Sequence, residues 1–378
     1  MKYISFLFLF VLSVHLCVAQ KSTTYLLVGT YTDGKPDKGI YVYKFNPLNG
    51  ELSKVSTAEN VTNPSFITLS TDGRFLYSCI DTKMPYSGNI AAFDFDSTNG
   101  QLKYLNKQSS AGANPVNLTV SENNKYIVTG NYTDASVTVF STNANGTINT
   151  LLQTIPFIDS SVNKVRQNKS HIHSTIFSPD YKFLYLPDLG ADKIRVYKFD
   201  SGNEKPLVPQ EQLTVHTVPG TGPRHMVFHP DKKFAYCTEE MGGMISAYTF
   251  KQGKLIVVQR IFSYSKPIKG DYSTADIHIS PDGKFLYASN RGENTISIFS
   301  IDKKGKLKLI DHHSTMGNTP RNFTLDPTGH FLLVANQLSD NIVVFKRDSV
   351  TGLLETTGIE IKVTTPTCVI MRTFQSGK

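Results

Sequence analysis

A unit of strand, turn and strand recurs along this chain, and the repeat limits the possible folds more than any other feature. The fullest copy runs from Ala275 to Phe299. Residues 276–280 alternate between polar and apolar, a Ser-Pro-Asp-Gly turn follows, and a second segment ends at Asn290-Arg291. Alternation with a period of two residues, interrupted by a tight turn, predicts a β-meander.

Seven copies of this unit can be aligned on the position that Tyr287 occupies. They recur at spacings of roughly 46 to 57 residues, about 51 on average. A fixed period near 50 residues with about four strands in each unit is the signature of a β-propeller. The aligned anchor positions are Leu27, Tyr77, Val128, Tyr185, Tyr236, Tyr287 and Leu333.

The two ends of the chain indicate how the ring closes. The first copy begins at its second strand, whereas the tail from Pro366 to Ile370 has the pattern of a first strand without a partner. Pairing this tail with the first copy removes an open sheet edge. The sequence therefore predicts an all-β fold: a seven-bladed β-propeller of four-stranded antiparallel blades, closed by the C-terminal strand. We expect residues 20–378 to form this single domain.

The N-terminal residues 1–19 are expected to be a secretory signal peptide. Lys2 precedes an apolar run from Tyr3 to Val14, and small residues lie just before Gln20. The run is about 12 residues long, which is too short to span a bilayer and suits an export signal. We expect cleavage near Ala19-Gln20 and a mature protein that is periplasmic or secreted, without a membrane span.

Charge and cysteine content exclude several classes of protein. The net charge of +8 comes from dispersed basic residues, which argues against nucleic acid as a partner. The charge suits an anionic small ligand, although a solvated basic surface would give the same value. Cys79, Cys237 and Cys368 are far apart and odd in number, so no disulfide framework is expected. No Cys/His spacing indicates a zinc site, and we expect neither a metal nor a cofactor.

Functional residues are expected on one face of the ring, where first strands begin and second strands end, because loops on a rigid scaffold carry function. Two positions in each copy meet this condition. The position after the usual proline holds Ser65, Val116, His173, Arg224, Ala275, Arg321 and Thr367. The position three residues after the anchor holds Thr30, Ile80, Asn131, Asp188, Glu239, Asn290 and Asn336. The positions that follow these include Asp81, Tyr132, Glu240, Arg291 and Gln337.

Ten residues are therefore candidates for the site. The catalytic candidates are His171, His173, Arg224, Glu239 and Arg291. The substrate-binding candidates are Asn131, Asp188, His225, Arg321 and Asn336. Each has a structural alternative: a histidine can be a satisfied core residue, Asp188 can cap a turn, and an asparagine can bond backbone at a strand end. The arginines can be buried ion-pair partners of Glu239 and Glu240. Their convergence on one face favours a functional role.

Several segments together resemble the lactonase family of seven-bladed propellers, which includes propeller-type 6-phosphogluconolactonases and a fungal muconate-lactonizing enzyme. The resemblance covers essentially the whole chain after residue 19. The similar segments are Gly-Thr-Tyr-Thr (29–32), His-Ile-His (171–173), Gly-Thr-Gly-Pro-Arg-His (220–225), residues 275–292 and Pro-Arg-Asn-Phe (320–323). The chain departs from the family at Ile80-Asp81, where many members have an Asn-Glu pair.

The resemblance implies an active site on the axial face that contains His171 or His173, Arg224, Arg291 and Glu239. Opening a lactone needs a base that activates water and donors that stabilise the oxyanion. A glutamate or histidine suits the first role, and arginines suit the second as well as an anionic group on the substrate. We expect a monomeric hydrolase that acts on a sugar lactone resembling 6-phosphogluconolactone. A non-catalytic propeller that binds an anion and a muconate-type cycloisomerase are the alternatives.

Overall fold

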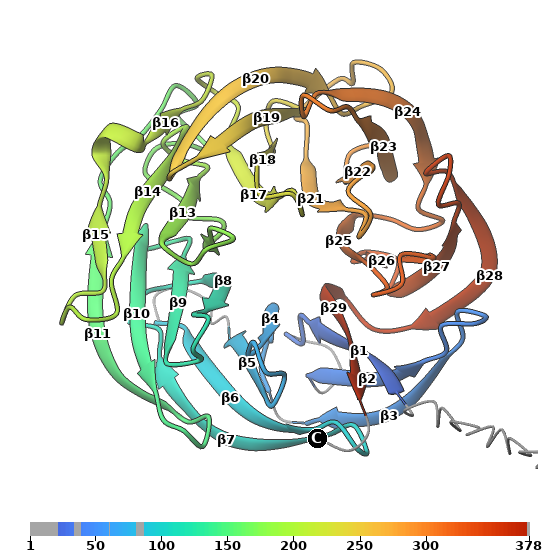
Figure 1. Ribbon diagram of the computed structural model, residues 1–378, viewed down its shortest axis with the longest axis horizontal. Helices are drawn as coiled ribbons and strands as arrows, with labels where there is room; N and C mark the ends of the chain where they lie inside the picture. The colour runs from blue at the N-terminus through green and yellow to red at the C-terminus, as the bar shows by residue number, and fades with distance from the viewer. Residues whose placement is uncertain (1–21, 34–38, 60, 81–86, 376–378) are drawn as a thin grey trace, which may run out of the picture.

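Seven antiparallel sheets are arranged in a ring around a central axis (Figure 1). The computed structural model describes residues 22–33, 39–59, 61–80 and 87–375. The prediction of a seven-bladed, four-stranded β-propeller is confirmed. The expected signal peptide, its cleavage point and Asp81 lie outside the described residues.

Each of the first three blades has four strands that follow one another from the axis outward. Blade 1 contains β29 (Pro366–Gln375), β1 (Ser22–Thr30), β2 (Ile40–Phe45) and β3 (Leu52–Ala58). Blade 2 contains β4 (Phe66–Leu69), β5 (Phe75–Ile80), β6 (Asn89–Asp96) and β7 (Gln101–Ser109). Blade 3 contains β8 (Pro115–Val120), β9 (Tyr126–Asn131), β10 (Ser136–Thr142) and β11 (Ile148–Pro156).

Blade 4 is irregular, because its outermost strand is divided in two by a short 3-10 helix. It contains β12 (Ile176–Phe177), β13 (Phe183–Asp188), β14 (Lys193–Phe199), β15 (Leu207–Pro209), η1 (Glu211–Leu213) and β16 (Val215–His216). Both β15 and β16 pair with β14. The connection of residues 157–175 that precedes this blade supplies several side chains of the site described below.

The last three blades return to the regular pattern. Blade 5 contains β17 (Pro223–Phe228), β18 (Phe234–Glu239), β19 (Met244–Lys251) and β20 (Lys254–Phe262). Blade 6 contains β21 (Thr274–Ile279), β22 (Phe285–Asn290), β23 (Thr295–Ile301) and β24 (Leu307–Ser314). Blade 7 contains β25 (Pro320–Leu325), β26 (Phe331–Asn336), β27 (Asn341–Arg347) and β28 (Leu354–Lys362).

The hydrophobic core is divided among the contacts between neighbouring blades. The sheets stack face to face, so the middle strands are buried on both faces and have nearly continuous apolar sequences, as Phe331–Asn336 shows. One cluster joins Leu27 of blade 1 to Ile67 and Phe93 of blade 2. Another joins Leu26 of blade 1 to Leu333 of blade 7. Each blade therefore buries its apolar faces against its neighbours.

The ring is closed as the sequence predicted. The C-terminal β29 is the innermost strand of blade 1 and pairs antiparallel with β1, from Ser22 opposite Gln375 to Thr30 opposite Pro366. Strands β29 and β1 lie side by side in Figure 1, at the red and blue ends of the colour range. Because both ends of the described chain share one sheet, β29 covers the inner edge of β1 and blade 1 has the same four strands as its neighbour blade 2.

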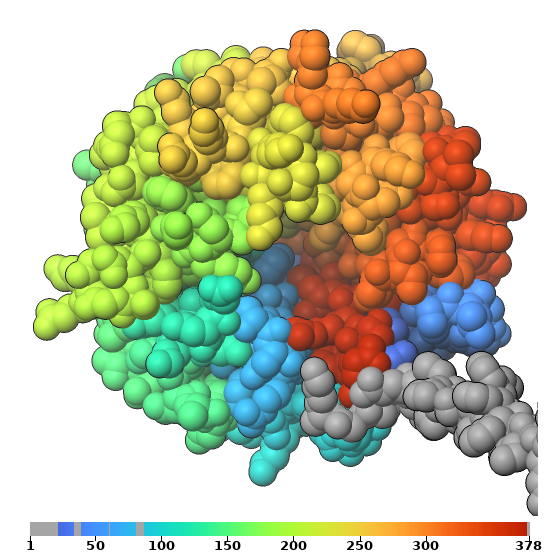
Figure 2. All heavy atoms as spheres, in the orientation of Figure 1, coloured from blue at the N-terminus to red at the C-terminus, as the bar shows by residue number. Residues whose placement is uncertain are grey.

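The anchor alignment is confirmed residue by residue. The position three residues after each anchor is the last residue of the second strand in every blade: Thr30, Ile80, Asn131, Asp188, Glu239, Asn290 and Asn336. The space-filling view shows the face of the ring hollowed at its centre, where the innermost strands meet (Figure 2). The residues next to these strand ends determine the chemistry of the axis.

Candidate active site

The last residue of a second strand and the residue after it have opposite environments. Glu239 makes its side-chain bonds to β19 and β20, within its own blade. Glu240 instead contacts arginines that belong to other parts of the ring. Side chains alternate in direction along a strand. The side chain of one residue therefore points into the blade, and that of the next residue points toward the axis.

Glu240 is the centre of a cluster of arginines. Its Oε2 accepts a hydrogen bond from Nε of Arg224 at 2.8 Å, and Nη2 of Arg291 lies 2.8 Å from the same oxygen. Its Oε1 accepts a hydrogen bond from Nη2 of Arg166 at 2.6 Å. Arg224 comes from blade 5, Arg291 directly follows β22 in blade 6, and Arg166 comes from the connection before blade 4. One carboxylate therefore joins three segments of the ring.

Arg321 adds a fourth positive charge near the axis. Its Nη2 lies 3.5 Å from the hydroxyl of Tyr31, and its guanidinium is 5.6 Å from the centre of the Tyr31 ring. Burial is the largest cause that lowers the pKa of Arg224 and of Arg291, and the charge of Arg321 lowers both further. Arg166, Arg224 and Arg291 contact the carboxylate of Glu240, and Arg321 lies near enough to act on Arg224 and Arg291, so the cluster has an excess of positive charge. Such a cluster attracts an anion.

The charged side chains of this cluster shift one another's pKa. Burial alone would raise the pKa of Glu240, but the charges of Arg291, Arg224 and Arg166 outweigh it and lower the pKa to about 2. Burial, and next the charge of Arg291, lower the pKa of Arg224 to about 9. At neutral pH the carboxylate is ionised and Arg224 keeps its proton.

Two histidines lie beside the arginines, against the ring of Tyr132. The His171 ring stacks on Tyr132 at 4.3 Å between centroids, and its Nδ1 is 2.9 Å from the Tyr132 carbonyl oxygen. The His173 ring meets the edge of Tyr132 at 5.5 Å, and its buried Nδ1 has no hydrogen-bond partner among the described residues. Burial, followed by the charge of Arg224, lowers the pKa of His173 well below the usual value. His173 is therefore neutral at neutral pH.

His225 follows Arg224 on β17 and lies against His173 and Asp276. Its ring is 5.3 Å from that of His173, and its Nδ1 is 2.7 Å from Oδ1 of Asp276. Burial and then Arg224 lower the pKa of His225 to about 4. His225 and Asp276 line a cavity of about 290 Å³, which His278 also lines. His225 thus lies between the arginine cluster and this axial cavity.

The structure brings six of the ten predicted residues to the axis and leaves four inside the blades. The six are His171, His173, Arg224, His225, Arg291 and Arg321. The four are Asn131, Asp188, Glu239 and Asn336, each the last residue of a second strand.

The four inner residues have structural contacts. Nε of Arg260 donates to Oε1 of Glu239 at 2.9 Å. Asp188 accepts a hydrogen bond from Nε of Arg195 at 2.9 Å and another from the backbone N–H of His171 at 2.8 Å. Asp188 therefore positions the histidine segment without reaching the axis. The remaining two are amides that donate to backbone carbonyls: Asn131 to Ser110 and Asn336 to Thr315.

Three residues of the cluster were not among the ten candidates. Glu240 and Tyr132 follow strand ends directly, and strand alternation was the signal that could have selected them over Glu239 and Asn131. Arg166 lies in the connection of residues 157–175, which has no counterpart in the other copies, and no sequence pattern places it near Glu240.

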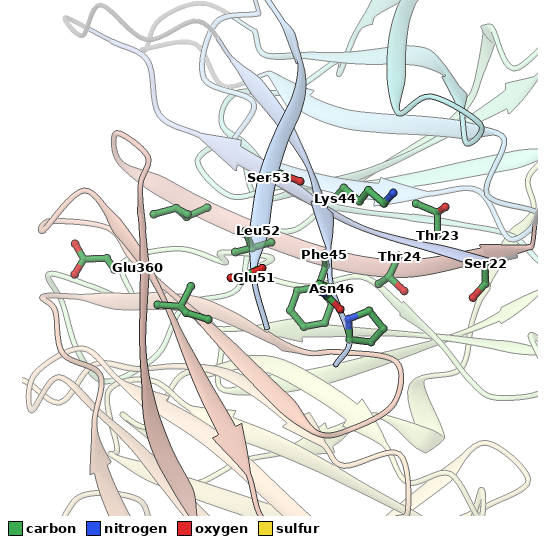
Figure 3. A pocket seen from close by; sticks show the side chains of 13 residues that line it. Ser22, Thr23, Thr24, Lys44, Phe45, Asn46, Glu51, Leu52, Ser53 and Glu360 are labelled. Atoms are coloured by element: carbon green, nitrogen blue, oxygen red, sulfur yellow. The ribbon is translucent and has the colours of Figure 1, made fainter. Parts of the chain in front are cut away.

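Another hollow lies away from the axis and carries no comparable chemistry. It has a volume of about 680 Å³ and lies between the outer strands of blades 1 and 7. Its charged side chains, Lys44, Glu51 and Glu360, are spread along it, and none of its lining residues is a histidine (Figure 3). We therefore place the candidate active site at the axis.

In residues 22–33, 39–59, 61–80 and 87–375, no group of three or more His, Cys, Asp or Glu side chains is arranged to hold a metal ion. Within the same ranges no helix is long and apolar enough to cross a membrane. Cys237 and Cys368 are free thiols and are buried, and Cys79 is buried as well.

The fold and the site define a seven-bladed β-propeller with a cationic cluster on its axis. A family model described as "Lactonase, 7-bladed beta-propeller" matches residues 25–371. The chain belongs to this lactonase family, as the resemblance in the sequence indicated.

Named relatives agree with this assignment. The chain is 43% identical to a protein of Formosa agariphila named 6-phosphogluconolactonase, over 92% of this chain and 99% of the relative. It is 32% identical to a Bacillus subtilis protein of the same name, over 90% and 96% of the two chains. The structure of a periplasmic gluconolactonase from Pseudomonas aeruginosa superposes with a TM-score of 0.88 at 32% identity, covering 93% of this chain and 99% of the other.

Proposed function

We propose that this protein is a lactone hydrolase, a carboxylic ester hydrolase that opens an anionic sugar lactone such as 6-phosphogluconolactone. The observation that carries the proposal is the Glu240 carboxylate between Arg224 and Arg291 on the propeller axis. It combines a group that can take a proton from water with groups that can stabilise negative charge. The names of the relatives support the same reaction.

Hydrolysis requires one proton to be removed and later returned. In the proposed mechanism, Glu240 accepts a proton from the attacking water as its oxygen bonds to the lactone carbonyl carbon. The tetrahedral intermediate then collapses, the bond to the ring oxygen breaks, and that oxygen takes the proton back from Glu240. The product is the open hydroxy acid, and the carboxylate is regenerated.

The arginines supply the electrostatic part of the mechanism. Nη2 of Arg291 is close to Glu240 but is not aligned to donate a hydrogen bond to any described residue. It is therefore a candidate donor to the developing oxyanion. Arg321 has no carboxylate partner within the described ranges and is assigned to the anionic group of the substrate, together with Arg166.

His173 and His225 are assigned supporting roles. Both are neutral at neutral pH because burial lowers their pKa. The buried Nδ1 of His173, unpaired within the part of the chain that the structure describes, can bond a substrate hydroxyl. His225 is fixed by Asp276 and forms the floor beneath it. These roles concern binding and orientation of the sugar ring.

The proposal includes export and a monomeric state. The sequence of residues 1–19 has the features of a secretory signal, and one structural relative is a periplasmic protein. Cell fractionation with antibody detection tests export, and light scattering of the purified protein tests the monomer. Recovery of the full-length chain in the cytoplasmic fraction contradicts export.

The decisive experiment is an assay of purified residues 20–378. Ring opening of 6-phosphogluconolactone and of free gluconolactone is followed by acid release, with spontaneous hydrolysis subtracted. We expect acceleration, and a loss of about 10²-fold or more in kcat/KM for Arg291→Ala. Phosphate binding without turnover would instead indicate a ligand-binding propeller, and lactone formation from a muconate would indicate a cycloisomerase.

A further inference from the structure

Arg166 differs from the other arginines that contact Glu240. The side chain of Arg224 is 1% exposed and that of Arg291 is 15% exposed, whereas that of Arg166 is 37% exposed. Arg224 and Arg291 also bond backbone carbonyls, of Ala275 and Ser273 respectively. Arg166 is thus the one of these three partners that solvent or a ligand can readily reach.

The backbone beneath Arg166 is fixed, so movement there is limited to the side chain. The Oδ1 of Asn163 accepts hydrogen bonds from the backbone N–H groups of Val165 at 3.1 Å and Arg166 at 3.0 Å. Gln167 is fully buried and donates to the Leu189 carbonyl at 2.9 Å. A long flexible side chain on a rigid turn can exchange partners without rearrangement of the loop.

The two oxygens of Glu240 are held by different partners. Oε2 is held by Arg224 and Arg291, which belong to the buried part of the cluster. Oε1 is held by Arg166. If Arg166 leaves, one oxygen becomes free while the other keeps the carboxylate in place. That is the arrangement a positioned base requires.

Arg166 has a second contact near the cluster. Tyr132 lies close enough to interact electrostatically with the Arg166 side chain, and the Tyr132 ring stacks on His171. The groups that face Glu240 are therefore Arg166, Arg224, Arg291 and, at longer range, Tyr132. All three arginines are cationic, so loss of any one makes the carboxylate a stronger base.

We propose that Arg166 is a substrate-responsive latch: it occupies Oε1 of Glu240 in the free protein and moves to the anionic group of an incoming lactone. The exchange frees Oε1 to accept the proton of the attacking water. This inference rests on the proposed lactone hydrolysis, and it couples binding of the anion to activation of the base. An anionic lactone then gains both affinity and rate, whereas a neutral lactone leaves the latch closed.

Movement of Arg166 to the substrate makes Glu240 a stronger base as well as freeing its Oε1. A carboxylate with a pKa of about 2 is a weak base, because three guanidinium charges stabilise its ionised form. Transfer of Arg166 to the substrate removes one hydrogen bond and one positive charge from Glu240. The substrate anion further offsets the remaining charges, so the base becomes stronger only when the correct ligand is bound.

The test compares Arg166→Met with the wild type on two substrates, 6-phosphogluconolactone and free gluconolactone. We expect kcat/KM for the phosphorylated lactone to fall about 10- to 100-fold, the size of a lost charged hydrogen bond. For the free lactone we expect a rise of about threefold, because Oε1 is no longer occupied. Lys164→Met is the matched control, because Lys164 lies on the same turn and bonds the Ser161 carbonyl. We expect that control to change neither substrate's kcat/KM.

A binding measurement separates failure of the latch from failure of the proposed function. Calorimetry with inorganic phosphate is expected to show an affinity about 10- to 100-fold lower for Arg166→Met than for wild type or Lys164→Met. If neither lactone is hydrolysed but phosphate binding depends on Arg166, the proposed reaction is rejected while the anion exchange stands. Parallel losses on both lactones, or equal phosphate affinity in all three proteins, would overturn the latch.

Discussion

At the residue scale, the choice between two adjacent glutamates follows from strand geometry. Glu239 ends β18 and pairs with Arg260 inside blade 5, whereas Glu240 reaches the axis. Alternation along a strand makes the residues at these two positions chemically different, although their sequence contexts are nearly the same. A variant at each position can therefore separate catalysis from stability.

Glu240→Gln is expected to lower kcat/KM for lactone hydrolysis about 10²-fold or more, because the amide cannot accept the proton of water. Glu239→Gln is expected to lower it less than about tenfold and to reduce the unfolding free energy by about 1–3 kcal/mol, since Arg260 loses a charged partner. Steady-state kinetics and urea unfolding measure the two effects. Larger kinetic damage from Glu239→Gln than from Glu240→Gln would contradict the assignment.

The buried His225 gives a prediction about pH. Its pKa in the folded protein is about 4, below the ordinary 6.5, so the unfolded chain binds a proton that the folded protein does not. The neutral His225 therefore makes its full contribution to the unfolding free energy above about pH 6.5. That contribution, about 3 kcal/mol, is lost as the pH falls from about 6.5 to 4. His225→Asn, which keeps a donor for Asp276, should flatten that loss. Urea midpoints at pH 7 and pH 4.5 provide the measurement, and an unchanged pH dependence would refute it.

At the element scale, each anchor tyrosine joins its blade to the next one. The hydroxyl of Tyr236 in blade 5 donates to the Gly305 carbonyl in the β23–β24 turn of blade 6 at 3.0 Å. Gly305 has a φ of +75°, and a Cβ there would lie 2.3 Å from the Phe234 ring. The same contact joins Tyr185 to Gly253 and Tyr287 to Gly352. The repeat therefore preserves an interaction between blades as well as a pattern within them.

Tyr236→Phe is expected to reduce the unfolding free energy by about 1–2 kcal/mol, because the Gly305 carbonyl loses its buried partner. Gly305→Ala is expected to cost more, since it adds backbone strain and a contact with Phe234. Tyr104→Phe, at an exposed tyrosine, is the control. The midpoint of denaturant unfolding measures all three. Equal midpoints for Tyr236→Phe and Tyr104→Phe would contradict this role.

At the scale of the whole molecule, closure of the ring depends on strand β29. It supplies the innermost strand of blade 1, and Val369 is buried against blade 7 while Cys368 is buried against blade 2. Loss of this strand exposes the edge of β1 and two interblade clusters at once.

Truncation after Val363 is expected to abolish soluble expression or cooperative unfolding, because blade 1 can no longer connect blades 2 and 7. Val369→Asp is expected to have a milder effect, a loss of several kcal/mol from a buried unpaired charge. Gln375→Ala, at the exposed end of the strand, is the control. Expression yield and thermal unfolding measure the outcome. A truncated protein that unfolds like the wild type would show that the closure is not needed.

The site was less predictable than the scaffold, and particular residues show why. Arg224, Arg291, His173 and Arg321 occupy repeated positions, so alignment of the copies was enough to group them. Arg166 lies in a connection without a repeat, and its position beside Glu240 results from a loop path that no periodicity encodes. Contacts of this kind depend on chain segments that are distant in the sequence.

The sequence by itself determined the number of blades, the order of strands and the closure, because each follows from hydrophobic alternation and turn residues that repeat locally. Only the tertiary structure decided that Glu240 rather than Glu239 belongs to the arginine cluster, and that Arg166 and Tyr132 complete it. The physical reason is that a one-residue step at a strand end reverses the direction of a side chain. The sequence of a strand shows the two-residue alternation of its side chains. Which of those side chains face the axis depends on the assembled ring.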